Sequence, residues 1–186
     1  MKCANDYLAR CEGIRFELYD RKLVNDLFLY FIGSADSPYD LRKGLWLEGP
    51  IGVGKTTLIN VFRELMLTFR KGFLVTTATE IANVYSATGS LDTYINNANG
   101  YLGRPVNLCI DELGREQIPA MHFGNKLNVM QYLLQQRYGL WQSRGVITHA
   151  TTNFDWRDIK NKYDDFILDR CRHMFNIVTV DGKSKR

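Results

Sequence analysis

The chain has 186 residues, enough for one domain with a buried core but short for two. Its 45% hydrophobic and 24% charged residues are typical of a globular protein, and no apolar run approaches the length of a membrane span. The net charge of +4 permits contact with nucleic acid without requiring it, and scattered cysteines without a signal peptide favour a reduced, cytoplasmic setting.

Residues 1–43 are expected to form a short helical leader that precedes a core of residues 44–186. Within the leader, residues 5–12 can form a short helix, and residues 20–31 carry apolar side chains at helical spacing. For this second helix we favour packing on the core over a separate interaction module. The polar segment 34–40 is expected to be a loop.

The next segment joins an apolar strand candidate, residues 45–48, to a glycine-rich turn that reads G-x-x-x-x-G-K-T. Its glycines allow successive main-chain N–H groups to form an anion nest, and the N-terminus of the following helix also favours phosphate. Lys55 can reach the β- and γ-phosphates, and the Thr56 hydroxyl can ligate Mg²⁺. The flanking strand and helix argue against a merely flexible turn. The predicted nucleotide-binding residues are Gly49, Pro50, Ile51, Gly52, Val53, Gly54, Lys55, Thr56 and Thr57.

The elements after this motif alternate between helix and strand patterns. Residues 58–69 show helical spacing, with an expected end near Gly72, and residues 73–77 are a strand candidate. Two short helices are expected at residues 79–85 and 91–97, followed by a loop rich in Asn and Gly.

Residues 106–112 form the second informative stretch, a mostly apolar strand that ends in two adjacent carboxylates. Cys109 is expected to be buried within it. Side chains alternate along a strand, so Asp111 and Glu112 should point in different directions. One of them could then serve Mg²⁺ while the other orients or activates the attacking water. The alternative is a solvated acidic loop, which the upstream phosphate motif makes less favourable.

The rest of the chain contains a helix candidate at residues 127–144 and a strand candidate at residues 146–151. Asn153 follows this strand and could lie beside Glu112 to hold the attacking water, or it could simply start a turn. Further elements are expected at residues 155–163 and 166–174 (helices) and 176–180 (strand).

This order of elements resembles the core of AAA+ ATPases and, more narrowly, the DnaC/IstB-type ATPases, which include replicative-helicase loaders and transposition helper ATPases. The matching segments read like the family's phosphate loop, its I-D-[DE]-[LI]-G-x-E signature, its sensor-1 strand, its Y-G-x-R-x-x-[SD]-R segment and its closing G-x-S-x-R. In this chain they are residues 49–57, 110–116, 150–153, 163–170 and 182–186.

The resemblance implies an α/β P-loop NTPase fold, with a five-stranded parallel sheet in the order 5-1-4-3-2 and helices on both faces. ATP and Mg²⁺ are the implied cofactors, with Lys55 on the phosphates and both Thr56 and Asp111 on Mg²⁺. The implied catalytic residues are Glu112, Asn153 as sensor 1, and Arg170 as an arginine finger that reaches into the neighbouring subunit. Arg172 is the alternative finger, and a plain surface arginine is the alternative role for Arg170.

The sequence also departs from the family pattern. Asp164 and Phe166 replace a glycine and an arginine of the Y-G-x-R segment, so contacts made there by relatives are not expected. The chain resembles a compact version, without a helical lid, a sensor-2 arginine or a large N-terminal partner-binding domain.

We therefore expect an ATP-hydrolysing protein of DNA replication, a helicase loader that works as an oligomer on DNA with a replicative helicase as partner. The alternatives are a transposition helper with a transposase as partner, and a P-loop small-molecule kinase. Direct binding of single-stranded DNA stays open, because packing and solvation explain the candidate side chains equally well. Those candidates are Tyr94, Tyr101, Arg104 and Lys126.

Overall fold

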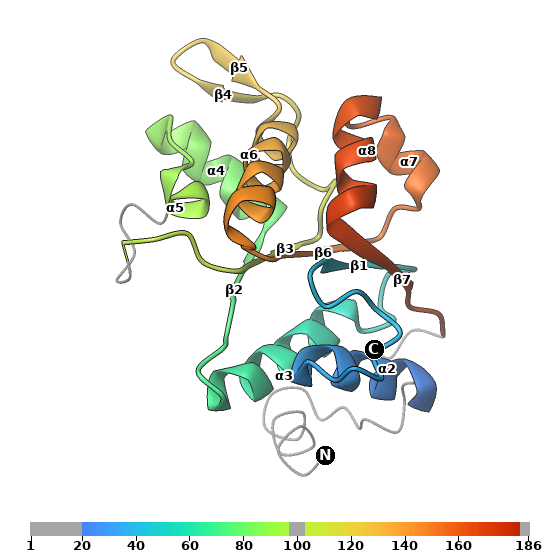
Figure 1. Ribbon diagram of the computed structural model, residues 1–186. Helices are drawn as coiled ribbons and strands as arrows, with labels where there is room; N and C mark the ends of the chain where they lie inside the picture. Colours follow the sequence, from blue (N-terminus) through green and yellow to red (C-terminus); the bar gives the residue numbers. More distant parts are fainter. Residues whose placement is uncertain (1–19, 97–102, 183–186) are drawn as a thin grey trace.

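A five-stranded parallel sheet forms the centre of the structure, a computed structural model that describes residues 20–96 and 103–182 (Figure 1). Its strands are β1 (Gly44–Glu48), β2 (Leu74–Thr77), β3 (Leu108–Asp111), β6 (Thr148–Thr152) and β7 (Phe175–Thr179). A separate antiparallel hairpin consists of β4 (Ala120–His122) and β5 (Asn125–Leu127). The helix expected at residues 5–12, the residue Tyr101 and residues 183–186 of the closing motif lie outside the described residues.

The sheet order is β2-β3-β6-β1-β7, and every neighbouring pair of strands is parallel. These labels differ from the expected 5-1-4-3-2 because the β4–β5 hairpin, which was not expected, takes two numbers between β3 and β6. If only the strands of this sheet are numbered in chain order, the series from β7 to β2 reads 5-1-4-3-2.

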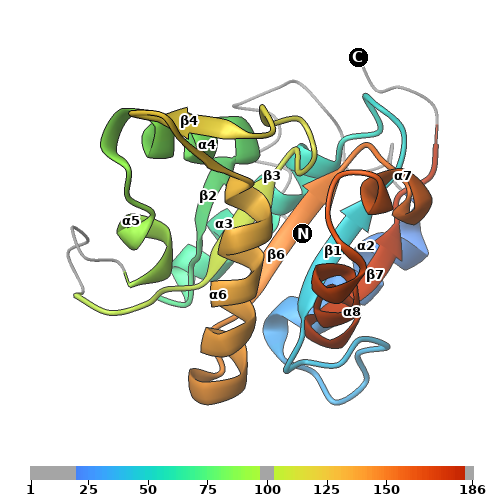
Figure 2. The ribbon, with the colours of Figure 1, turned by 90° about the horizontal axis from the view of Figure 1, so that it is seen from above.

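Helices cover both faces of the sheet, as expected for a parallel sheet whose strands are apolar on both sides. In Figure 1, α2 and α3 lie below the sheet and the remaining described helices lie above it. Figure 2 shows α6 and α8 crossing the upper face beside one another. The bounds are α2 Arg21–Ile32, α3 Lys55–Thr68, α4 Ala78–Thr88, α5 Asp92–Ile95, α6 Val129–Arg144, α7 Trp156–Lys160 and α8 Asp165–Met174.

Alternation along β1 divides the apolar core into two layers. Leu45 and Leu47 pack with α2 and α3 on one face, whereas Trp46 packs with the helices of the opposite face. Helix α2 is capped by Asp20, whose carboxylate accepts a hydrogen bond from the Leu23 N–H (2.8 Å). Its buried residues join the layer of α3, so this helix packs on the core as expected.

Several helix and strand boundaries differ from the sequence expectation, and local contacts explain two of them. Helix α3 ends at Thr68, before Gly72, because Arg70 adopts a left-handed conformation (φ 57°). Helix α6 begins at Val129, where the Asn128 side chain accepts a hydrogen bond from the Gln131 N–H (3.2 Å) and caps the helix. The residues before this cap belong to the hairpin, which packs on α4 (Figure 2).

The phosphate motif lies at the carboxyl edge of the sheet, where β1 turns into α3. Gly49 allows this turn: its φ is 149°, and a Cβ there would lie 2.2 Å from the carbonyl oxygen of Val180. Within the part of the chain that the structure describes, no helix has the length and apolar composition needed to cross a membrane.

Candidate functional site

The glycine-rich segment wraps the N-terminus of α3, and the predicted nucleotide-binding residues lie together as expected from their sequence. Residues 49–54 form the loop, and Lys55 is the first residue of the helix. Gly52 and Gly54 have φ values of 86° and 90°, a conformation that L side chains rarely adopt. The N-terminus of α3 and its helix dipole favour an anion at this place.

Lys55 is buried, and its ammonium group lies between the loop and β6. Its Nζ donates hydrogen bonds to the carbonyl oxygens of Gly49 (2.6 Å) and Pro50 (2.8 Å) and to Oδ1 of Asn153 (2.8 Å). Burial lowers the pKa of Lys55, and the negative charges of Asp111 and Glu112 oppose that shift. The ammonium therefore contacts only neutral acceptors among the described residues and forms no ion pair with either carboxylate.

Thr56 and Asp111 come from α3 and β3 and meet at the same edge of the sheet. The Thr56 hydroxyl donates to the Asp111 carboxylate, with both oxygens at 3.0 Å. Thr151 of β6 also donates its hydroxyl to this carboxylate. Thr151 thus orients Asp111, a role that the sequence analysis missed although Thr151 belongs to the matched segment 150–153.

The charges at this edge fit a phosphate and a divalent cation. Among the described residues, no carboxylate lies within ion-pair distance of Lys55, and no cationic side chain lies within that distance of Asp111. A phosphate would supply the missing anion for Lys55. Mg²⁺, which prefers oxygen ligands and keeps several waters, would supply the missing cation beside Asp111 and Thr56.

The carboxylates of Asp111 and Glu112 contact different side chains, as predicted, although Glu112 lies past the end of β3. Glu112 has a φ of 55°, so the chain turns immediately after β3, and its N–H donates to the Thr151 hydroxyl (3.1 Å). Its carboxylate pairs with Arg115 (2.8 Å). The amide oxygen of Asn153 accepts a hydrogen bond from Lys55, and its place beside Glu112 stays a prediction.

A buried pair supports the loop that carries Glu112. The Glu116 carboxylate accepts hydrogen bonds from the Gly114 N–H (2.9 Å) and from the Tyr163 hydroxyl (2.5 Å). Burial and the adjacent negative charge of Glu116 raise the pKa of Tyr163, so this hydroxyl stays a donor. Glu116 lies in the matched segment 110–116, but the sequence did not indicate its partner.

Arg170 lies apart from these residues, on α8. Its guanidinium group covers the ring of Phe166 (3.8 Å to the centroid) and lies 5.1 Å from the centroid of the Tyr138 ring on α6. Arg172 lies over the Trp156 ring at 5.2 Å. In the described chain neither arginine forms a salt bridge.

The comparisons with known proteins agree with this geometry. No protein-family model matches the sequence, and a search of curated proteins finds no match. Solved structures do match. A protein described as a primosome component from Streptococcus pyogenes serotype M3 has a TM-score of 0.63 and 18% identity, covering 94% of this chain and 89% of that one.

Two further structures are similar to the chain. A DnaC helicase loader has a TM-score of 0.59 and 18% identity, covering 87% of this chain and 89% of that one. AMPPCP-bound DnaA from Aquifex aeolicus has a TM-score of 0.56 and 14% identity, covering 86% of this chain and 47% of that one. The fold is that of the AAA+ P-loop ATPases, and over most of its length it resembles compact DnaC-type proteins.

Proposed function

We propose that this chain binds and hydrolyses ATP with Mg²⁺ and works, as an oligomer on DNA, as a DnaC-like loader of a replicative helicase. The observation that carries the proposal is the meeting of Lys55, Thr56 and Asp111 at one edge of the sheet. They bring a buried ammonium, a hydroxyl and a carboxylate to the N-terminus of α3. The similarity in fold to a helicase loader and to a nucleotide-bound initiator supports the same assignment.

Each residue has a distinct task in this proposal. Lys55, now held by neutral acceptors, would turn to the β- and γ-phosphates, and Asn153 would then be released to orient water. Glu112 would accept the proton of the attacking water after its carboxylate leaves Arg115. Mg²⁺ would be held by Thr56 and Asp111, and when bound it supplies positive charge that stabilises the transferring phosphoryl group.

Two substitutions separate nucleotide binding from hydrolysis. Lys55→Ala should remove ATP binding at the phosphate motif, seen in calorimetry as loss of the Mg²⁺-dependent heat, because the cation that meets the phosphates there is lost. Glu112→Gln should retain binding and lose hydrolysis by about 10²-fold or more, as expected when a general base is removed. The measurements are titration calorimetry with Mg²⁺ and ATP, and release of inorganic phosphate.

Thermal unfolding of both variants without nucleotide serves as the control for folding. Hydrolysis by Glu112→Gln at the wild-type rate would show that the catalytic assignment is wrong. Failure of the wild-type protein to bind either ATP or GTP would overturn the whole proposal.

The helicase assignment needs a separate experiment. The tagged protein, incubated with a cell extract in Mg²⁺ and either ATP or ADP, should retain a replicative helicase in a nucleotide-dependent manner. Retention of a transposase would favour the transposition helpers. Transfer of the γ-phosphate to a small molecule, with no dependence on DNA, would favour the kinase alternative.

A further inference from the structure

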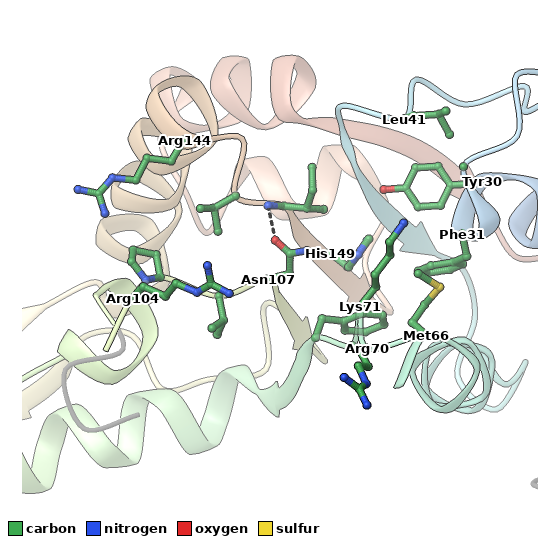
Figure 3. Close-up of a pocket in the computed structure, with 17 residues that line it drawn as sticks. Tyr30, Phe31, Leu41, Met66, Arg70, Lys71, Arg104, Asn107, Arg144 and His149 are labelled. Carbon is green, nitrogen blue, oxygen red and sulfur yellow. Dashed lines mark hydrogen bonds between the residues drawn. The ribbon is translucent and has the colours of Figure 1, made fainter. Parts of the chain in front are cut away.

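A basic cleft lies at the amino edge of the sheet, opposite the phosphate motif. It has a volume of about 650 Å³ and is lined by residues that precede β2, β3 and β6, together with the ends of α2, α3 and α6 (Figure 3). This volume lies within the range of small-molecule sites, roughly 300–1,000 Å³. None of the residues described so far as holding phosphate or Mg²⁺ lines it.

The charge of the cleft is of one sign. Arg70, Lys71, Arg104 and Arg144 line it, and none of its described lining residues is Asp or Glu. Figure 3 shows Arg104 and Arg144 on one side and Arg70 and Lys71 on the other. All four are exposed, and none forms a salt bridge within the described part of the chain.

Helix ends explain only part of this arrangement. Arg144 is in the last turn of α6 and Arg70 follows α3, where cations complement the helix dipoles. Arg104 belongs to a loop and has no such role. Like charges placed close together repel one another, so an anion between the two sides of the cleft would relieve the repulsion.

The floor of the cleft offers a buried donor and an apolar surface. His149 is 3% exposed, and its Nδ1 accepts a hydrogen bond from the Leu45 N–H (3.1 Å), so the ring proton is on Nε2. That nitrogen has no hydrogen-bond partner among the described residues. The centroid of the Phe73 ring lies 4.8 Å from that of His149, and Met66, Val106 and Val146 add apolar surface to the same lining.

We propose that this cleft is a second binding site, distinct from the phosphate motif, for a phosphorylated ligand of nucleotide chemistry. The phosphates would lie between the cations of the two sides of the cleft. The base would cover the apolar floor, and one of its acceptor atoms would take a hydrogen bond from Nε2 of His149. The ligand is either a free nucleotide or one nucleotide of a single strand, since both present the same groups. This inference goes beyond the proposed ATPase function and does not depend on it.

The experiment uses Lys55→Ala, which removes the first site, as the background. Binding of ATP and of a fluorescein-labelled single-stranded (dT)₈ is measured separately at low salt by calorimetry and fluorescence anisotropy. We expect one of these probes to bind, and Arg104→Glu with Arg144→Glu to weaken that binding at least tenfold. ATP binding identifies a free nucleotide, whereas binding of (dT)₈ alone identifies a strand.

Arg21→Glu with Arg157→Glu is the matched control, because both residues are exposed, lie outside the cleft lining and change the net charge equally. This control should retain the affinity within about twofold. Arg104→Gln with Arg144→Gln provides a milder variant if the reversed charges lower the thermal midpoint. Absence of binding by both probes, or equal loss in cleft and control variants, overturns the proposal. Equal displacement by a hexaglutamate peptide also overturns it, in favour of an acidic protein segment.

Discussion

At the scale of single residues, several buried polar side chains form hydrogen bonds with other segments of the chain. Lys55 donates to Asn153, and Asp111 accepts from Thr56 and Thr151. His149 accepts from the main-chain N–H of Leu45 in β1. A buried polar group without a partner costs about 1–3 kcal/mol, so these contacts hold the loops in place without ligand.

His149 gives the protein a pH-dependent stability. Burial, and secondarily the positive charge of Arg137, lowers the pKa of His149 to about 3, whereas an unfolded histidine has a pKa of about 6.5. Below pH 6.5, the side chain of His149 binds a proton in the unfolded chain but not in the folded chain. The contribution of His149 to the free energy of unfolding is therefore complete above pH 6.5. It falls by roughly 1.4 kcal/mol per pH unit as the pH is lowered toward 3.

We expect His149→Gln, whose amide oxygen can accept from the Leu45 N–H, to lose this part of the pH dependence. The measurement is the free energy of unfolding by urea between pH 7 and pH 4, in the wild-type and variant proteins. Carboxylates contribute equally to both curves, so their difference isolates His149. If the free energy of unfolding depends on pH in the same way in both proteins, His149 is not the source of this pH dependence.

At the scale of elements, Arg137 connects α6 to the sheet and to two loops. It is 1% exposed and donates to the Thr148 hydroxyl (2.8 Å) and to the carbonyl oxygens of Tyr94, Val106 and Ile147 (3.0–3.1 Å). Burial lowers the pKa of Arg137 to about 10, so the group stays charged at neutral pH. Its planar fork reaches acceptors that a lysine could not satisfy together.

Arg137→Lys should therefore lower the free energy of unfolding by about 1–3 kcal/mol, because buried carbonyl groups lose their donors. Urea unfolding at pH 7 measures this loss. Arg157→Lys, an exposed exchange on α7, is the matched control and should change stability by less than about 0.5 kcal/mol. Equal effects of the two substitutions would contradict the role of Arg137.

Most elements follow from local sequence patterns, and the misplaced boundaries have local causes. Apolar runs and helical spacing located α2, α3 and the five sheet strands, since these elements bury a regular face. The β4–β5 hairpin was not predicted, because its strands have three residues each and bury little. It is stabilised by packing on α4, where His122 Nδ1 lies 3.0 Å from the Ser86 carbonyl oxygen, a contact invisible in sequence.

At the scale of the whole molecule, the sheet separates two candidate anion sites. The carboxyl edge of the sheet carries the phosphate motif and the adjacent residues Asp111 and Glu112, and the amino edge carries the basic cleft. Arg170 lies at neither place, since it covers aromatic rings between α6 and α8. A role in hydrolysis would require it to reach the site of another subunit.

We accordingly expect the ATPase activity per subunit to rise steeply with protein concentration, or on addition of single-stranded DNA. Arg170→Ala should remove this rise while retaining ATP binding, because a finger supplied in trans contributes its roughly 10³–10⁵ in rate only when subunits assemble. Phosphate release is measured across a hundredfold range of concentration, and loss of the rise in Arg172→Ala in place of Arg170→Ala would assign the finger to Arg172. Activity per subunit that stays flat under both conditions would contradict a finger acting in trans.

The sequence by itself determined the fold class, the phosphate loop and the pair Asp111–Glu112, because these depend on residues adjacent in the chain. Only the tertiary structure decided that Asn153 contacts Lys55, that Thr151 orients Asp111, and that four cations line one cleft. The physical reason is that hydrogen bonds and charges act over a few ångströms in space. Residues that are distant along the chain reach that separation only when the sheet brings its strands together.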